Sequence, residues 1–388
     1  MPAPSRPSPA SFLKHASEVA SSYGFRPLRE IERMIPNLER RAHSFAVAAG
    51  VAVQANSQNL QLPVLTYFAS ASPMHTPPQS STWPARDVGE FGLQIVGVPE
   101  SLAEAVLLKT VSTIINEWGT PLARVRLNAL GDKDSKARFE REAGVYVRKH
   151  IAHLDPECRE SLTKQPMAPY RCTSELCRGV VEGGPRAMNF LSERSRAHFR
   201  EVLEHLERLS LPYEFDDLLM HDERDPRMLF AFDLAQEDAT ILAGTGGRFD
   251  DYLRRLPVRS PVRGAKETSG VAASLYFRKA GLSTDSFKLP AQKIQPSVYF
   301  IQLGLRAKLE GLLVLDVLRQ AHIPVLQSFD PARLTPQLSA ARDAKVSHLI
   351  IMGAREALDR TVLVRTMNDS SQTVVGLSEL PRYLKTLR

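Results

Sequence analysis

The stretch that decides the fold lies near the middle of the chain, where three glycines in four positions precede an arginine, an aromatic residue and two aspartates. It reads Gly244-Thr245-Gly246-Gly247-Arg248-Phe249-Asp250-Asp251. We predict a turn here, because glycine lets the backbone approach a ligand closely. Arg248 offers a planar fork for a carboxylate or phosphate, and Asp250 can accept hydrogen bonds from an ammonium group or a ribose. The alternative is a plain loop with a surface arginine–aspartate pair.

Outward from this stretch, the hydrophobic pattern predicts a mixed α+β region. Two strands, 229–234 and 240–243, lead into the turn as an antiparallel hairpin. Helical spacing of apolar residues predicts helices over 11–23, 102–115 and 199–209, and alternation predicts a half-buried strand over 125–129. Residues 37–88 show no clear pattern. This mixture favours a layer of strands with flanking helices.

Beyond residue 290 the pattern changes to alternating strands and helices. The strands are predicted over 298–303, 323–326 and 346–352, the helices over 305–321, 334–344 and 377–387, and a hairpin over 361–365 and 373–375. Strands separated by helices of this length imply a mainly parallel sheet covered on both faces.

Four further segments resemble the histidyl-tRNA synthetase family of class II aminoacyl-tRNA synthetases, and they occur in the family's order. They are Tyr23-Gly24-Phe25, Phe91-Gly92-Leu93-Gln94, Arg126-Leu127-Asn128-Ala129-Leu130-Gly131, and the passage from Ser192-Glu193 to Leu211-Pro212-Tyr213-Glu214. The central stretch matches the family's Gly-Gly-Arg-Tyr-Asp. The resemblance implies a class II synthetase-like catalytic domain, an antiparallel sheet with flanking helices, over 11–290. It also implies an anticodon-binding-like α/β domain over 297–388 and a homodimer.

Composition fits this reading. The chain has 388 residues, of which 43% are hydrophobic and 24% charged, as in a globular protein of two domains. Its apolar runs are too short to cross a bilayer. Residues 1–10 carry four prolines among serines and lack the apolar core of a signal peptide, so we expect a disordered lead and a cytoplasmic protein with no membrane partner. The formal charge of +7 favours a polyanionic partner.

The three cysteines, Cys158, Cys172 and Cys177, suit a reducing compartment. Their clustering raises the question of zinc, for which His150 or His153 would have to supply a fourth ligand. The spacing matches no common zinc finger. We therefore predict unpaired thiols in a small helical segment, and no metal site.

The family's catalytic positions are degenerate in this chain. Where the second signature motif of the family has an arginine and a glutamate, the alignment puts Met74 and Thr76, which cannot hold a phosphate or supply a charge. Asp222 stands where the histidine-specific motif has its arginine, so the sign of the charge is reversed. In the third motif, Tyr276 and Phe277 cover the final glutamate and arginine. Arg278 follows one residue later, which on a helix would face another side.

These losses predict a paralogue of histidyl-tRNA synthetase that does not aminoacylate and that acts as a regulatory, tRNA-binding or protein-binding factor. The alternatives are the regulatory subunit of ATP phosphoribosyltransferase and a divergent but active histidine-tRNA ligase. The resemblance makes histidine, ATP or AMP candidate ligands, with no cofactor assigned, and Gly246, Gly247, Arg248 and Asp250 the candidate binding residues. In the C-terminal block, Arg333, Arg342 and Lys345 are the candidate RNA-binding residues.

Overall fold

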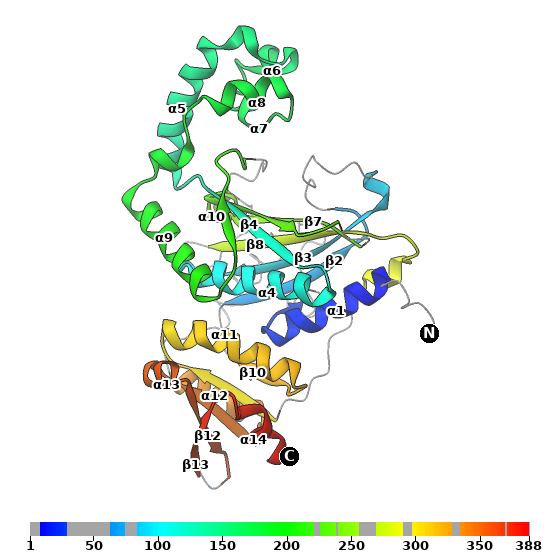
Figure 1. Ribbon diagram of the computed structural model, residues 1–388, viewed down its shortest axis with the longest axis vertical. Coiled ribbons are helices and arrows are strands. Elements are labelled where there is room, and N and C mark those ends of the chain that lie inside the picture. The colour runs from blue at the N-terminus through cyan, green and yellow to red at the C-terminus, as the bar shows by residue number, and fades with distance from the viewer. Residues whose placement is uncertain are drawn as a thin grey trace.

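The computed structural model contains two β-sheets that share one chain (Figure 1). It describes residues 8–28, 63–73, 84–220, 226–237, 240–255, 269–289, 297–327, 334–368 and 371–387. The larger sheet carries the central glycine stretch, and the smaller sheet is built from the C-terminal block. The predicted architecture, a mainly antiparallel sheet with flanking helices followed by an α/β domain, is confirmed.

Eight strands among the described residues form the larger sheet, in the order β1-β2-β3-β8-β7-β6-β4-β5. Their bounds are β1 Arg26–Pro27, β2 Val64–Ser70, β3 Val88–Val96, β4 Leu122–Ala129, β5 Tyr213–Phe215, β6 Met228–Leu234, β7 Ile241–Arg248 and β8 Gly270–Arg278. The pairings at the two edges, β1 with β2 and β4 with β5, are parallel, and the five between them are antiparallel. The predicted hairpin is confirmed as β6 and β7. Strand β2 lies in the unpatterned region and was not predicted.

Three helices cover one face of this sheet: α1 (Pro9–Ser22), α4 (Leu102–Trp118) and α9 (Glu193–Arg208). Helix α1 begins at Pro9 because the Ser8 hydroxyl caps it, accepting the N–H of Ser11 at 3.2 Å. The predicted disordered lead over 1–10 is therefore wrong for its last two residues, and residues 1–7 lie outside the described ones. Across the part of the chain that the structure describes, every helix is too short or too polar to cross a bilayer.

A helical arm projects from the sheet, on the side away from the C-terminal sheet (Figure 1). It contains α5 (Lys133–Lys149), α6 (Pro156–Ser161), α7 (Ala168–Arg171) and α8 (Glu175–Glu182), with short 3-10 turns over Ile151–His153 and Ala187–Phe190. Its apolar side chains form a small core separate from the main one, and residues from all four helices contribute to it.

The C-terminal sheet has the order β10-β9-β11-β12-β13. Its strands are β9 Val298–Gln302, β10 Val325–Gln327, β11 His348–Met352, β12 Thr361–Thr366 and β13 Gln372–Gly376, and its helices are α11 Leu305–Gln320, α12 Leu334–Asp343, α13 Ala354–Asp359 and α14 Leu380–Thr386. The sheet is mixed rather than mainly parallel. Strands β12 and β13 form the predicted hairpin, and β12 pairs antiparallel with β11, whereas β9 pairs parallel with β10 and β11. Helix α13 was not predicted.

Helices α4 and α11 lie against each other and join the two sheets (Figure 1). Charged side chains hold this contact: Lys109 of α4 lies 2.5 Å from Asp316 of α11, and Arg319 of α11 pairs with Glu117 of α4. The Tyr23 hydroxyl also donates to Asp316. Burial, and next the negative charge of Asp316, raise the pKa of Tyr23 well above its usual value, so this phenol stays a donor at neutral pH.

Candidate functional site

The glycine stretch is a strand and not a turn, which corrects the sequence-based prediction. Gly244, Gly246 and Gly247 all lie within β7, between β6 and β8. A Cβ at Gly246 would lie 2.1 Å from the Phe230 ring and 2.4 Å from the carbonyl oxygen of Ala272, and one at Gly247 would lie 2.4 Å from the carbonyl oxygen of Met228. Glycine is therefore needed here because the neighbouring strands leave no room for a side chain.

Arg248, at the end of β7, is enclosed by the protein, and 2% of the residue is exposed. Nε and Nη2 donate to the two carboxylate oxygens of Glu104, at 2.5 and 2.6 Å. Nη1 donates to the carbonyl oxygen of Val98 and to Asp250 Oδ1, at 3.2 and 3.3 Å, and Nη2 also donates to the carbonyl oxygen of Glu100, at 3.1 Å. A guanidinium has five N–H donors, so protein acceptors use all of them.

The partner carboxylate, Glu104 on α4, is fully buried and ionised. Burial by itself raises the pKa of Glu104, but the charge and hydrogen bonds of Arg248, and then those of His198, outweigh burial and lower this pKa to about 2. His198 Nε2 lies 2.8 Å from Glu104 Oε1. The same pair raises the pKa of Arg248 despite its burial. The bidentate pair therefore joins the end of β7 to α4 across the interior of the protein.

Asp250 and Asp251, at the start of α10 (Asp250–Arg255), also contact protein groups. Asp250 Oδ1 accepts the N–H of Gly270, the first residue of β8, at 2.9 Å, and Asp250 Oδ2 lies 3.4 Å from Arg227. Asp251 lies 3.2 Å from both Lys136 and Arg227. These contacts fix how the chain leaves β7 and how β8 begins.

The candidate ligand-binding residues therefore contact other protein groups and, among the described residues, leave no open binding position. The structure brings Arg248 and Asp250 together, while Gly246 and Gly247 face the neighbouring strands. Ligand binding at Arg248 stays a prediction, and it would require Glu104 to release at least one of the two donors it now accepts from.

Of the four degenerate catalytic positions, Met74, Thr76 and Asp222 lie outside the described residues. Phe277 is completely buried in β8, with its ring centroid 5.2 Å from that of Phe12 and 6.3 Å from that of Phe287. The segment is a strand through Arg278, so the helical geometry expected for it is wrong. Successive side chains of a strand point to opposite faces, and the exposed Arg278 thus lies on the face opposite Phe277.

A row of polar side chains on the sheet face opposite α1 and α4 was not predicted from the sequence. Glu90 of β3 is buried, and Ser274 of β8 donates to its Oε1 at 2.5 Å. Thr245 of β7 lies opposite Ser274 in the register. Glu90 was the sign of this row, because it is a charged residue within a strand that is buried along its whole length. A charged residue is rarely fully buried without a partner.

The candidate RNA-binding residues lie beside the C-terminal sheet. Arg342 lies in the last turn of α12, Lys345 follows that helix, and both are exposed. Arg333 lies outside the described residues.

The three cysteines come together in the helical arm. They form no disulfide, and their sulfur atoms all lie within 4.8 Å of one another. His150 and His153, considered above as fourth ligands, do not belong to this group. The sequence assigned no metal site because the spacing fits no common finger, yet the fold brings the three thiols to one point.

Comparisons with known proteins fit this architecture. No family model matches the chain. The chain is 27% identical to the histidine-tRNA ligase of Geobacillus thermodenitrificans over 330 residues, which are 83% of this chain and 74% of that ligase. It is 25% identical to the ligase of Thermosynechococcus vestitus over 305 residues, covering 78% of this chain and 69% of that one. The chain is homologous to histidine-tRNA ligases. Its polar row, buried arginine and glycine strand are therefore features of a chain homologous to histidine-tRNA ligases.

Among solved structures, the apo histidyl-tRNA synthetase of S. aureus is similar with a TM-score of 0.47 and 18% identity, over 96% of this chain and 94% of that one.

Proposed function

We propose that this chain is a histidyl-tRNA synthetase paralogue that has kept the scaffold, lost adenylate chemistry, and acts by binding tRNA or a protein partner. The observation that carries the proposal is Phe277. At the position that aligns with the family's third-motif arginine, the chain has an apolar ring packed between Phe12 and Phe287 in the main core. A phenyl ring cannot neutralise phosphate charge. The adjacent Arg278 is exposed and lies on the opposite face of the strand, which also carries Ser274.

The substitutions at Met74, Thr76 and Asp222 support the same proposal from the sequence. Each removes a charge that the family's motif provides or reverses its sign. Loss of one such electrostatic contact to a transition state typically costs about 2.7–4 kcal/mol of barrier, and this chain lacks several. We infer that adenylate formation is reduced to an undetectable rate.

A charging assay tests the proposal. We expect no transfer of labelled histidine to histidine tRNA by the purified full-length chain, under conditions in which an active histidyl-tRNA synthetase charges the same tRNA. Charging above a blank without enzyme would identify the chain as a divergent ligase.

The regulatory subunit of ATP phosphoribosyltransferase is the alternative within the same class of inactive paralogues. We favour a tRNA-binding or protein-binding role over it because that relative usually lacks the anticodon domain, whereas the described residues of the C-terminal block form a five-stranded sheet with four helices. Stimulation of an ATP phosphoribosyltransferase catalytic chain by this protein would favour the alternative.

The tRNA part of the proposal rests on exposed cations beside the C-terminal sheet. Arg342 and Lys345 can each neutralise one phosphate, so we expect weak, salt-sensitive and poorly selective binding. In gel-shift titrations at two salt concentrations, replacing both with alanine should reduce the slope of log K against log salt by about 1.4, since each phosphate contact of a single strand contributes about 0.7. Arg355, an exposed cation of α13 paired with Asp359, provides the matched control.

Two outcomes of the titration would change this part of the proposal. Binding of no RNA at low salt would leave a protein partner as the function of the C-terminal sheet. Tight and selective binding of histidine tRNA would mean that the domain retains full recognition. The homodimer that the family resemblance implies is part of the same proposal, and light scattering of the purified chain tests it.

A further inference from the structure

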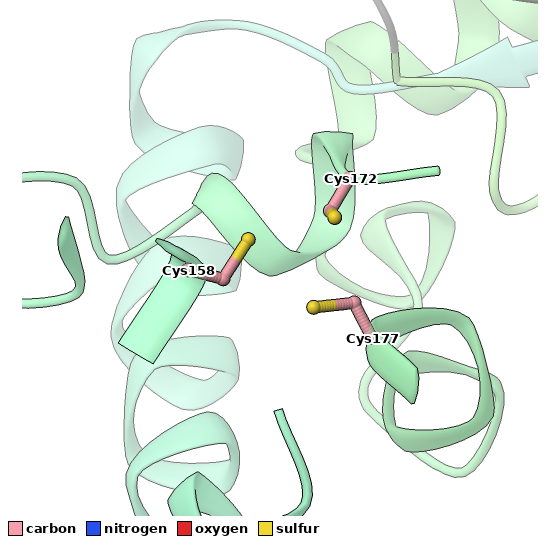
Figure 2. A group of neighbouring side chains, drawn as sticks. All are labelled: Cys158, Cys172 and Cys177. Atoms are coloured by element: carbon pink, nitrogen blue, oxygen red, sulfur yellow. The ribbon is translucent and has the colours of Figure 1, made fainter. Parts of the chain in front are cut away.

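The cysteine cluster of Cys158, Cys172 and Cys177 lies in the helical arm, outside the region that aligns with the family's catalytic motifs. Figure 2 shows the three sulfur atoms pointing toward a common centre, from α6, from the end of α7 and from α8. These are all the cysteines of the chain. In sequence, Cys172 is 14 positions after Cys158 and five before Cys177, so the cluster exists only because the arm folds back on itself.

The spacing of the sulfur atoms suits one metal ion. Each lies within 4.8 Å of the other two. A zinc ion with four ligands and zinc–sulfur bonds of about 2.3 Å holds its sulfurs about 3.8 Å apart. Small side-chain rotations therefore bring the three thiols to bonding distance. An iron–sulfur cluster would need its cysteines farther apart, because several metal and sulfide ions must fit between them.

The surrounding backbone supports thiolates at this point. The N–H of Ser174 donates to Cys172 Sγ at 3.4 Å, and the backbone of Asp155 hydrogen-bonds to Cys177. Cys177 is the third residue of α8, in its first turn, where the helix dipole favours a negative charge. Donors of this kind orient metal-bound sulfur and stabilise its charge.

Buried thiols become metal ligands by losing their protons. A metal cation takes the place of these protons, which leave to solvent.

We propose that Cys158, Cys172 and Cys177 bind a single thiophilic metal ion of the zinc(II) or copper(I) class. For zinc(II) a solvent molecule or another exchangeable ligand completes the tetrahedron, since the described residues offer three protein ligands at this point. Cys172 is half-buried while the other two are buried, so solvent reaches the ion from its side.

The ion joins three short helices. α6 has 6 residues, α7 has 4 and α8 has 8, lengths at which a helix has little stability of its own. Each contributes or adjoins one ligand, so the ion cross-links all three. Metal binding in small elements of this kind contributes directly to folding. The ion should thus stabilise the arm without affecting either sheet.

The test uses the full-length chain, purified without chelators or a histidine tag. We expect about one zinc or copper per chain by elemental mass spectrometry, which also distinguishes the two ions. Cobalt(II) added to the metal-free protein should give a sulfur-to-cobalt charge-transfer absorption, which zinc(II) abolishes. Cys158→Ser and Cys177→Ser should lose both the metal and the absorption. His153→Ala, which changes a ligand-type residue outside the cluster, should keep them.

Two further measurements use the wild-type chain, so their outcome does not depend on whether the cysteine variants fold. In the wild-type chain, zinc(II) should slow alkylation of all three thiols, and metal removal should raise hydrogen exchange in 156–182 while leaving β3, β7 and β8 unchanged. The proposal is wrong if the wild-type protein retains no metal, gives no cobalt absorption, and alkylates at equal rates with and without zinc(II).

Discussion

Strand β7, which carries the glycine stretch and Arg248, and the cysteine cluster both contain residue types that bind ligands in other proteins. Their surroundings in this protein are opposite. At the end of β7, Arg248 has five donors and the protein supplies an acceptor for each of them. In the helical arm, three thiols converge, and the N–H of Ser174 donates to one of them. The first arrangement is complete, and the second offers three ligand atoms to a cation.

This difference shows that a motif identifies the chemistry a residue can perform, whereas its neighbours decide whether that chemistry is available. A buried guanidinium that holds a carboxylate in two bonds contributes to the fold. Clustered thiols cross-link the segments that carry them once a metal ion binds. The predictions below test these two descriptions, from the largest expected effect to the smallest.

Arg248→Ala should be the most damaging single change. It leaves the carboxylate of Glu104, which is 0% exposed, without its main counter-charge in the interior. Breaking a buried pair from one side typically costs about 3–5 kcal/mol, and the free energy of unfolding from urea titration measures it. Lys14→Ala removes one partner of an exposed pair with Glu18 and serves as the control, with an expected change of at most about 0.5 kcal/mol.

If Arg248→Ala changed the free energy of unfolding as little as that control does, the Arg248–Glu104 pair would not stabilise the fold. The arginine would then be available to a ligand, and the contrast with the cysteine cluster would disappear. Calorimetric titration of the wild-type chain with histidine, ATP and AMP checks this directly.

Phe277→Ala tests a second buried side chain of the larger sheet. The ring is 0% exposed and packs against Phe12 and Phe287, so truncation should cost about 3–5 kcal/mol. Arg278→Ala, on the other face of the same strand, should stay within about 0.5 kcal/mol. Equal effects at the two positions would contradict the assignment of Phe277 to the core.

The pH dependence of stability isolates Glu104. Its folded pKa, about 2, lies below the unfolded value of 4.5. The ionised pair therefore stabilises the fold fully above pH 4.5, and this contribution is lost as the pH falls from 4.5 toward 2. The difference in pKa corresponds to about 3 kcal/mol. Unfolding free energies of wild type and Glu104→Gln should converge over this window. Parallel pH profiles would mean that Glu104 does not titrate as described.

Gly246→Ala should have a smaller effect. The added methyl group would meet the Phe230 ring and the backbone carbonyl of Ala272, and such overpacking typically costs about 1–3 kcal/mol. Gly179 lies in α8 with nothing within 4 Å of the added carbon. Gly179→Ala should therefore stabilise the protein by about 0.5–1 kcal/mol, since alanine favours helix. A stabilising Gly246→Ala would restore the original prediction of an open turn.

The sequence predicted the architecture because apolar periodicity and family motifs extend over most of the chain. The hairpin of β6 and β7, helix α1 and the C-terminal sheet followed from that pattern. Strand β2 did not, because five consecutive buried residues carry no alternation.

The local details of the candidate site could not be predicted, because they depend on contacts far apart in the sequence. Arg248 meets Glu104 across 144 positions, and this partner converts a motif resembling a ligand-binding turn into a buried ion pair. The three cysteines meet only through the fold of the arm, so spacing rules for zinc fingers did not find them. Consecutive glycines favour a turn locally, but crowding between β6 and β8 explains them equally well.

The measurement that tests the central claim most directly is ATP–pyrophosphate exchange with histidine, because it follows adenylate formation alone and needs no tRNA. The purified full-length chain, verified as folded, is compared with a sample that lacks histidine and with an active histidyl-tRNA synthetase. The account predicts exchange equal to the histidine-free blank. Histidine-dependent exchange well above that blank would contradict it, since a chain with Phe277 in its core would then still form the adenylate.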